Sequence, residues 1–265
     1  MVERIVETDD EDLFVRVVGD GPPLLLVHAY PLSGELWPHQ VETFAATRRV
    51  IIPDLRGFGR SAVTPGEVSM RRHADDLASV LDAVGVVEPV AYCGVSMAGY
   101  VGWQFAERYG DRVAGLFMSS TKARADSGAA VAKRRKIAAA IEAEGIAAAQ
   151  GVADALIGPS SKPRLPTLRD ELREIIGGND PRGVVAAQHG MAARPDMTDF
   201  VRSFGKPLHF VAGTEDAFTT AEEIRELSRS VGAGFTAVEG AGHLVPIERP
   251  EDYNAALRAF LREFG

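Results

Sequence analysis

The stretch Val90-Ala91-Tyr92-Cys93-Gly94-Val95-Ser96-Met97-Ala98-Gly99 decides how the rest of the chain is interpreted. An apolar run leads into Gly-x-Ser-x-Ala-Gly, and a helical pattern that extends through Tyr109 follows at once. This order predicts a strand, a tight turn and a helix, with the serine at the apex, an arrangement called a nucleophile elbow. The serine would adopt a strained backbone conformation that only the surrounding structure can enforce. Gly94, Ala98 and Gly99 are small, so strand and helix have room to close up behind it.

The elbow is one of a series of predicted strands. Continuous apolar runs on both sides of it are typical of strands that are buried on both faces, as in a parallel sheet. Strands that alternate with helices imply right-handed crossovers and helices on both faces. The predicted fold class is therefore α/β, a mostly parallel, eight-stranded, doubly wound sheet. Besides the elbow strand, its members are an opening hairpin of 5–7 and 13–18, then 24–27, 50–53, 113–118, 208–212 and 235–238.

The alternation of strands and helices stops after Ser120. From about residue 125 to 199 only helical patterns follow, around 129–144, 146–156, 168–176 and 181–193. The last of these has Asp180 in position to cap it and Pro181 at its first turn. We interpret residues 122–200 as a helical cap inserted after the sixth strand, between core segments 1–121 and 201–265.

The composition excludes several classes of protein. A net charge of −8 argues against binding to nucleic acid or to an anionic membrane surface. A single cysteine in 265 residues excludes an internal disulfide framework and suits a reducing compartment. The first residues lack the apolar segment of a signal peptide, and no run approaches the roughly 18 apolar residues of a membrane span. We therefore expect a soluble, cytoplasmic protein, either a monomer or a homodimer.

Three chemically reactive residues follow predicted strands, where ligands bind in an open parallel sheet. They are Ser96, Asp216 in Gly213–Asp216 and His243 in Gly240–His243. A serine hydroxyl becomes a good nucleophile when a histidine takes its proton, and a carboxylate holds that histidine in the required tautomer. The chain order Ser, Asp, His is the order of the α/β-hydrolase arrangement.

On these residues the chain resembles the α/β-hydrolase superfamily. Within it, the chain resembles the branch of 3-oxoadipate enol-lactonases, small serine esterases and cofactor-free haloperoxidase-like enzymes. The resemblance covers nearly the whole chain outside the cap. Besides the elbow, it includes His28–Pro31, Asp54–Ser61 and Gly242–Glu251, with shorter matches in the cap at Gly178–Pro181 and Ala192–Asp196.

The resemblance implies a role for each site residue. Ser96 would be the nucleophile, Asp216 the acid and His243 the base, and the backbone N–H groups of Tyr30 and Met97 would form the oxyanion hole. The side chains of Tyr30, Met97 and Leu244 would line the substrate pocket. Two alanines, Ala29 and Ala98, stand where the family usually has glycine, so the oxyanion loop or the pocket could differ slightly.

The implied activity is hydrolysis of a carboxylic ester or lactone bond in a small molecule, through an acyl-enzyme intermediate and without metal or cofactor. Perhydrolysis, acyl transfer to another acceptor and C–C bond hydrolysis use the same three residues and stay open as alternatives. A ligand receptor with little turnover is a further alternative, which the complete set of three residues disfavours.

Other residues have two interpretations. The glycines of Gly57–Ser61 superficially match a dinucleotide fingerprint, but a turn follows them, so a bracing loop is favoured. His28 is expected to hold the neighbouring loop by hydrogen bonds. Cys93 is expected to be an inert buried thiol. Asp126 is an alternative acid, and Asp216 is preferred because it directly follows a strand.

Lys133-Arg134-Arg135-Lys136 is the one dense positive run in the sequence. Four consecutive helical residues point all round the helix axis, so a solvated face is the favoured interpretation. The alternative hypothesis is that one of these cations reaches the pocket and pairs with a substrate carboxylate.

Overall fold

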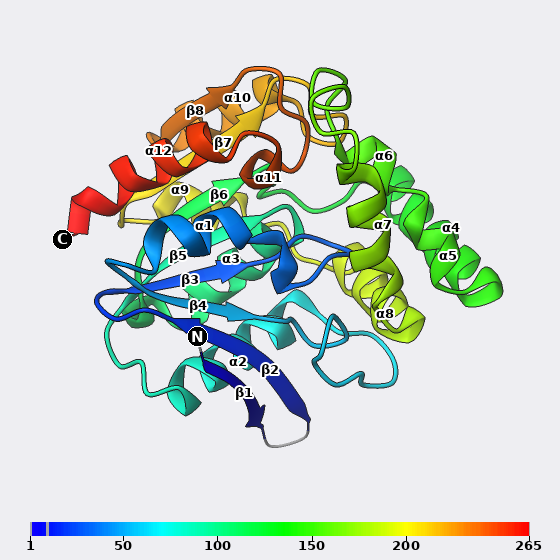
Figure 1. The fold of residues 1–265 in the computed structure, drawn as a ribbon, viewed down its shortest axis with the longest axis horizontal. Helices are drawn as coiled ribbons and strands as arrows, with labels where there is room; N and C mark the ends of the chain where they lie inside the picture. The colour runs from blue at the N-terminus through cyan, green and yellow to red at the C-terminus, as the bar shows by residue number, and fades with distance from the viewer. Residues whose placement is uncertain (1, 9–10, 265) are drawn as a thin grey trace.

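Eight strands lie side by side in one sheet, in the order β1-β2-β4-β3-β5-β6-β7-β8 (Figure 1). The structure is a computed structural model that describes residues 2–8 and 11–264. Strand β2 is antiparallel to both β1 and β4, and every other pair of neighbours is parallel. The predicted eight-stranded, mostly parallel sheet is confirmed. The strands are β1 Val2–Glu7, β2 Asp12–Val18, β3 Pro23–Val27, β4 Arg49–Pro53, β5 Val90–Val95, β6 Val113–Ser119, β7 Leu208–Gly213 and β8 Gly234–Val238.

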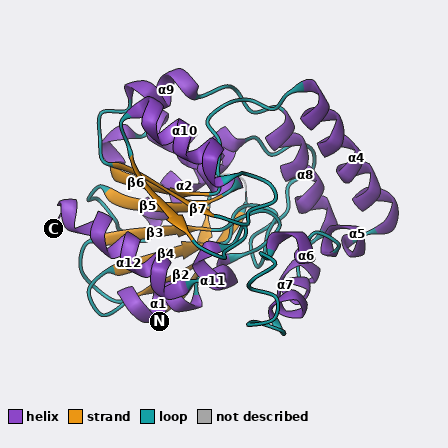
Figure 2. Ribbon diagram, turned by 90° about the horizontal axis from the view of Figure 1, so that it is seen from above, coloured by secondary structure: helices purple, strands orange, loops and turns teal. Residues whose placement is uncertain are grey.

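Helices cover both faces of this sheet (Figure 2). One group packs together as α1 Pro38–Phe44, α11 Val245–Glu248 and α12 Pro250–Leu261. The other group is α2 Met70–Ala83, α3 Met97–Arg108, α9 Thr198–Ser203 and α10 Ala221–Val231. Because both faces are covered, every residue of β3 and β5 is buried. This is the physical reason for their unbroken apolar sequences.

The register of the central strands sets where the elbow lies. Strand β5 runs between β3 and β6, and Gly94 pairs with Val27 on one side and Met118 on the other. Ser96 therefore follows the carboxyl end of a central strand, next to the loops that leave β3 and β6.

The predicted cap helices are present as α4 Gly128–Glu144, α5 Ile146–Gln150, α6 Ala153–Leu156, α7 Leu168–Gly177 and α8 Pro181–Ala192. They lie together beyond one end of the strands, and α4 packs against α8 (Figures 1 and 2). The side chain of Asp180 caps α8 by accepting from the Arg182 amide at 2.8 Å. Helix α9 crosses the expected boundary at residue 200 and packs against α3 and α10. The division of the chain into core and cap stays a prediction.

The loop Asp54–Ser61 braces the core against the cap. Gly57 has a positive φ of 83°, and a Cβ there would lie 2.8 Å from the Cα of Gly183 in α8, so only glycine allows this approach. Asn179, just before α8, accepts from the Gly59 amide at 2.7 Å and donates to the Pro31 carbonyl at 2.8 Å. The bracing role is the one favoured from the sequence.

Across the described ranges, no helix combines the length and apolarity needed to cross a membrane.

His73 in α2 is a buried histidine, and neither ring nitrogen has a hydrogen-bond partner among the described residues. Burial lowers its pKa to about 4, because desolvation of the imidazolium outweighs the attraction of Asp76. In the unfolded chain the pKa returns to its ordinary value of 6.5. Between these two values the unfolded state binds a proton that the folded state does not. The free energy of unfolding therefore falls by up to about 1.4 kcal/mol for each pH unit below 6.5.

Between pH 7 and pH 4.5, we expect the free energy of unfolding to fall by about 2 kcal/mol more in the wild type than in His73→Phe, because phenylalanine does not titrate. Urea unfolding at both pH values measures this difference. His39→Phe is the matched control, since His39 is only half-buried. If the His73 variant lost as much stability as the wild type over this range, the explanation would be wrong.

Candidate active site

Ser96 occupies the turn between β5 and α3 with φ 57° and ψ −112°. A positive φ is rare for a residue other than glycine and stores strain. The turn is held by two hydrogen bonds: the Ser96 amide donates to the Ser119 carbonyl at 2.9 Å, and Thr121 Oγ1 donates to the Ser96 carbonyl at 2.8 Å. A Cβ on Gly94 would lie 3.1 Å from the Ala98 Cβ, and one on Gly99 only 2.2 Å from Thr121 Oγ1. Gly94 is therefore small because strand and helix close up, as predicted, whereas Gly99 is small because Thr121 in the loop after β6 lies against it.

His243 and Asp216 form a buried pair. The His243 Nδ1 lies 2.9 Å and 3.0 Å from the two carboxylate oxygens of Asp216. The amides of Phe218 and Thr219 also donate to Asp216 Oδ1, at 2.8 Å and 3.1 Å. Burial raises the pKa of Asp216, but the neighbouring His243 and these hydrogen bonds outweigh it and lower the pKa overall. The carboxylate is therefore ionised and orients the ring.

One cavity brings Ser96 and His243 together. It has a volume of about 260 Å³, and residues from the core loops and the cap helices line it. The remaining lining residues are Tyr30, Tyr100, Lys122, Asp126, Ala130, Lys133, Arg134, Ile137, Val152, Leu156, Gln188, Met191, Phe218 and Thr219.

The expected oxyanion donors are the backbone N–H groups of Tyr30 and Met97, and neither amide has an acceptor among the residues that the structure describes. Met97 is the first residue of α3, so its N–H has no acceptor within the helix. Across residues 2–8 and 11–264, the Tyr30 amide donates no hydrogen bond to the protein. Of the three side chains expected in the pocket wall, only that of Tyr30 lines the cavity. Those of Met97 and Leu244 are fully buried and are not among the lining residues.

The other candidate residues have structural partners. His28 Nε2 accepts from the Leu55 amide at 3.0 Å, and its Nδ1 lies 3.0 Å from the Ala29 carbonyl, so both ring nitrogens hold loops. Cys93 is buried, which raises the pKa of its thiol to about 12. Asp126 contacts Arg134 and Arg194 and has no ion pair with His243. The preference for Asp216 as the acid agrees with these contacts.

Glu248 is a site residue that the sequence reasoning missed. Its carboxylate is 1% exposed and accepts from the amides of Gly242 at 2.9 Å and Leu244 at 3.1 Å, the two neighbours of His243. It also accepts from the Gly158 amide, beyond α6, at 2.8 Å. The His243 amide itself donates to the Leu156 carbonyl of α6 at 3.0 Å. Glu248 therefore positions the His243 loop and connects it to the cap. Its signals in the sequence are a carboxylate after the apolar Val245–Ile247 and its place within Gly242–Glu251, one of the stretches that carry the family resemblance.

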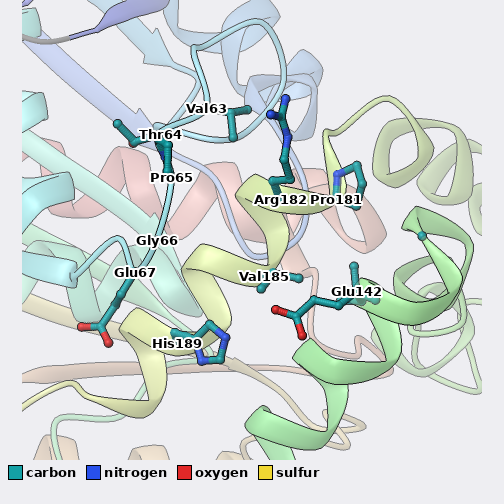
Figure 3. Close-up of a pocket in the computed structure, with 12 residues that line it drawn as sticks. Val63, Thr64, Pro65, Gly66, Glu67, Glu142, Pro181, Arg182, Val185 and His189 are labelled. Atoms are coloured by element: carbon teal, nitrogen blue, oxygen red, sulfur yellow. The ribbon is translucent and has the colours of Figure 1, made fainter.

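A larger cavity of about 570 Å³ lies between the loop 63–67 and helices α4 and α8 (Figure 3). His189 and Glu142 line it from the two helices, and Glu67 lines it from the loop (Figure 3). None of the expected catalytic residues lines it. The strained serine and the His–Asp pair, and not cavity size, therefore locate the candidate active site. Within the described part of the chain, no group of three or more His, Cys, Asp or Glu side chains could hold a metal ion.

The comparison with protein families agrees with this site and fold. The model of the alpha/beta hydrolase fold family matches residues 22–172, more than half of the chain. The chain belongs to this family.

Within this family, the chain is similar to esterases and enol-lactonases. A thermophilic esterase from Thermogutta terrifontis, solved with malate bound, is 36% identical and has a TM-score of 0.93, with 99% of this chain and 98% of that one covered. The enol-lactonase from Burkholderia xenovorans is 24% identical with a TM-score of 0.88, over 96% and 98% of the two chains. The 3-oxoadipate enol-lactonase 2 of Acinetobacter baylyi is 22% identical over 247 residues, which are 93% of this chain and 91% of the relative. The expected resemblance to the esterase and enol-lactonase branch is confirmed.

Proposed function

We propose that this protein hydrolyses a carboxylic ester or lactone bond of a small molecule through an acyl-enzyme intermediate on Ser96. The observation that carries the proposal is a strained serine that shares one cavity with His243, which is itself paired with the buried Asp216. The esterase and enol-lactonase activities named for the relatives support the same class of substrate.

The first half of the reaction transfers the acyl group to the enzyme. Asp216 accepts a hydrogen bond from the Nδ1–H of His243, so Nε2 carries no proton and can take the proton of the Ser96 hydroxyl as the serine oxygen attacks the carbonyl carbon. The negative charge that develops on the carbonyl oxygen is stabilised by the N–H groups of Tyr30 and Met97. Each such donor typically contributes about 3–4 kcal/mol in the transition state. His243 then returns the proton to the leaving alcohol, which stays tethered to the acyl chain when the substrate is a lactone.

The second half releases the acyl group. His243 takes a proton from a water molecule as the water oxygen attacks the acyl carbon, and the proton returns to Ser96 when the new acid departs. Every bond change needs only the ester, water and these side chains. The alternatives of perhydrolysis and acyl transfer replace this water by another acceptor, and no feature of the described cavity favours them.

Phosphorylation by diethyl p-nitrophenyl phosphate tests the nucleophile directly. We expect one phosphoryl group per chain, located on Ser96 by peptide mass spectrometry, with loss of activity in proportion to labelling. Ser79 lies in the same tryptic peptide and is exposed, so Ser79→Ala should label normally. Phosphorylation of Ser79, or of no serine in this peptide, would contradict the proposal.

A further inference from the structure

The wall of the catalytic cavity carries an excess of positive charge. Three cationic side chains line it, Lys122, Lys133 and Arg134, whereas Asp126 is the single carboxylate among the described lining residues. Three positive charges and one negative charge leave a net +2 in a chain whose overall charge is −8. Asp216 lies behind His243 and is not part of this wall. The local charge therefore favours an anionic ligand, against the charge of the protein as a whole.

Two of the three cations are already engaged by the protein. Arg134 Nε donates to Asp126 Oδ2, and its Nη1 lies 3.3 Å from Gln188 Oε1. The other carboxylate oxygen of Asp126 accepts from Arg194 at 2.7 Å, so two guanidinium groups share one negative charge. Lys122 lies 3.4 Å from Glu223, which Arg124 also contacts at 2.8 Å. These contacts fix Arg134 in place, and they leave the Asp126 charge fully compensated.

Lys133 differs from both neighbours in the wall. Its ammonium group has no ion pair or hydrogen bond with any described residue, and its side chain is exposed at the cavity wall. The residues Ala130, Arg134 and Ile137 of the same helix also line the cavity, so Lys133 belongs to the face of α4 that is turned toward Ser96. An ammonium group on a flexible stem, with no protein carboxylate to bind, is available to a carboxylate of the substrate.

We propose that the substrate is an ester or lactone that carries a free carboxylate, and that Lys133, beside the fixed Arg134, binds this carboxylate while the reacting carbonyl lies at Ser96. Half-esters of dicarboxylic acids and lactones with a carboxylate side chain belong to this class. The inference rests on the proposed function and names its substrate class. It also assigns different roles to the four cations of the run at 133–136, of which Arg135 and Lys136 are exposed and do not line the cavity.

The test compares two substrates of the same size that differ in charge, monomethyl glutarate and its neutral amide, methyl 4-carbamoylbutanoate. Proton release at low ionic strength gives kcat/KM for each. We expect the wild type to prefer the carboxylate by about tenfold, as a charge-assisted contact at a partly exposed site allows. Lys133→Glu should abolish this preference by raising KM for the carboxylate at least tenfold more than KM for the amide. Added salt should weaken the preference in the wild type, because it screens an exposed charge.

Arg135→Glu is the matched control. It makes the same change of charge on the same helix, but residue 135 lies about 200° around the axis from residue 133. The preference should survive in this variant. An equal loss on both substrates in Lys133→Glu, or an equal loss of preference in Arg135→Glu, would overturn the inference. Lys133 is exposed, so both variants should keep the thermal midpoint of the wild type.

Inhibition is a second test of the carboxylate preference, and it does not depend on turnover of methyl esters. Glutarate should inhibit hydrolysis of p-nitrophenyl butyrate about tenfold more strongly than glutaramide, its neutral diamide, in the wild type but not in Lys133→Glu. Hydrolysis of p-nitrophenyl butyrate without any preference for carboxylates would reject the inference and leave the proposed function standing. Failure of Ser96 to label would reject the proposed function itself.

Discussion

Ser96→Ala should abolish hydrolysis of p-nitrophenyl butyrate, with kcat lower by about 10⁵–10⁶-fold. The variant loses the oxygen that we propose as the nucleophile, while the cavity and the His243–Asp216 pair stay in place. The backbone at residue 96 keeps the same strained turn, because the hydrogen bonds that hold it run through the main chain and Thr121. We therefore expect an unchanged thermal midpoint.

Initial rates and a thermal melt of the same preparation check this result, and Ser79→Ala, on the exposed face of α2, should keep full activity. Activity within tenfold of the wild type in a folded Ser96 variant would mean that another group is the nucleophile.

Asp216→Asn should lower kcat by about 10⁴-fold while the protein stays folded. The asparagine oxygen can still accept from the amides of Phe218 and Thr219, but its NH₂ group would then face His243 Nδ1. That contact favours the tautomer with a proton on Nε2, which cannot accept the serine proton. The imidazolium that forms during the reaction also loses its neighbouring negative charge.

The same variant has a pH-dependent effect on stability. The pKa of Asp216 is lowered in the folded state, so its carboxylate stabilises the fold above the ordinary value of 3.8 and loses this contribution as pH falls through the folded value. The difference in free energy of unfolding between wild type and Asp216→Asn should therefore shrink in acid, as urea titrations at neutral and acidic pH would measure. If Asp126→Asn abolished activity and Asp216→Asn did not, the acid would be the alternative candidate.

Much of the fold could be predicted because local patterns determine it. The apolar runs of β3 and β5 lack alternation because helices cover both faces of the sheet, and this feature is visible in the sequence. The helical insertion was recognisable from its lack of strand patterns, and α8 from its capping residue and proline. The serine, acid and base could be proposed for a similar reason: loops that follow parallel strands meet at one edge of a sheet.

What the sequence could not supply depends on contacts between distant segments. Glu248 had no visible role until the fold brought Gly158 to the His243 loop, 85 residues away in sequence. Met97 and Leu244 were expected in the pocket wall, but neither is among the residues that line the cavity, because a position next to Ser96 or His243 in the sequence does not determine which way a side chain points. Gly99 could be predicted as small, but the partner that requires it, Thr121, comes from the loop after β6.

The elbow could be predicted from the sequence, whereas the roles of the four cations in the charged run could not. By itself the sequence determined the α/β fold, the turn that carries Ser96 and the order of the three candidate catalytic residues, because each follows from patterns within a short segment. Only the tertiary structure decided that Lys133 and Arg134 line the cavity and that Arg135 and Lys136 do not. The run at 133–136 contains cations that point all round α4, and only the packing of this helix over the core selects the face that meets the cavity.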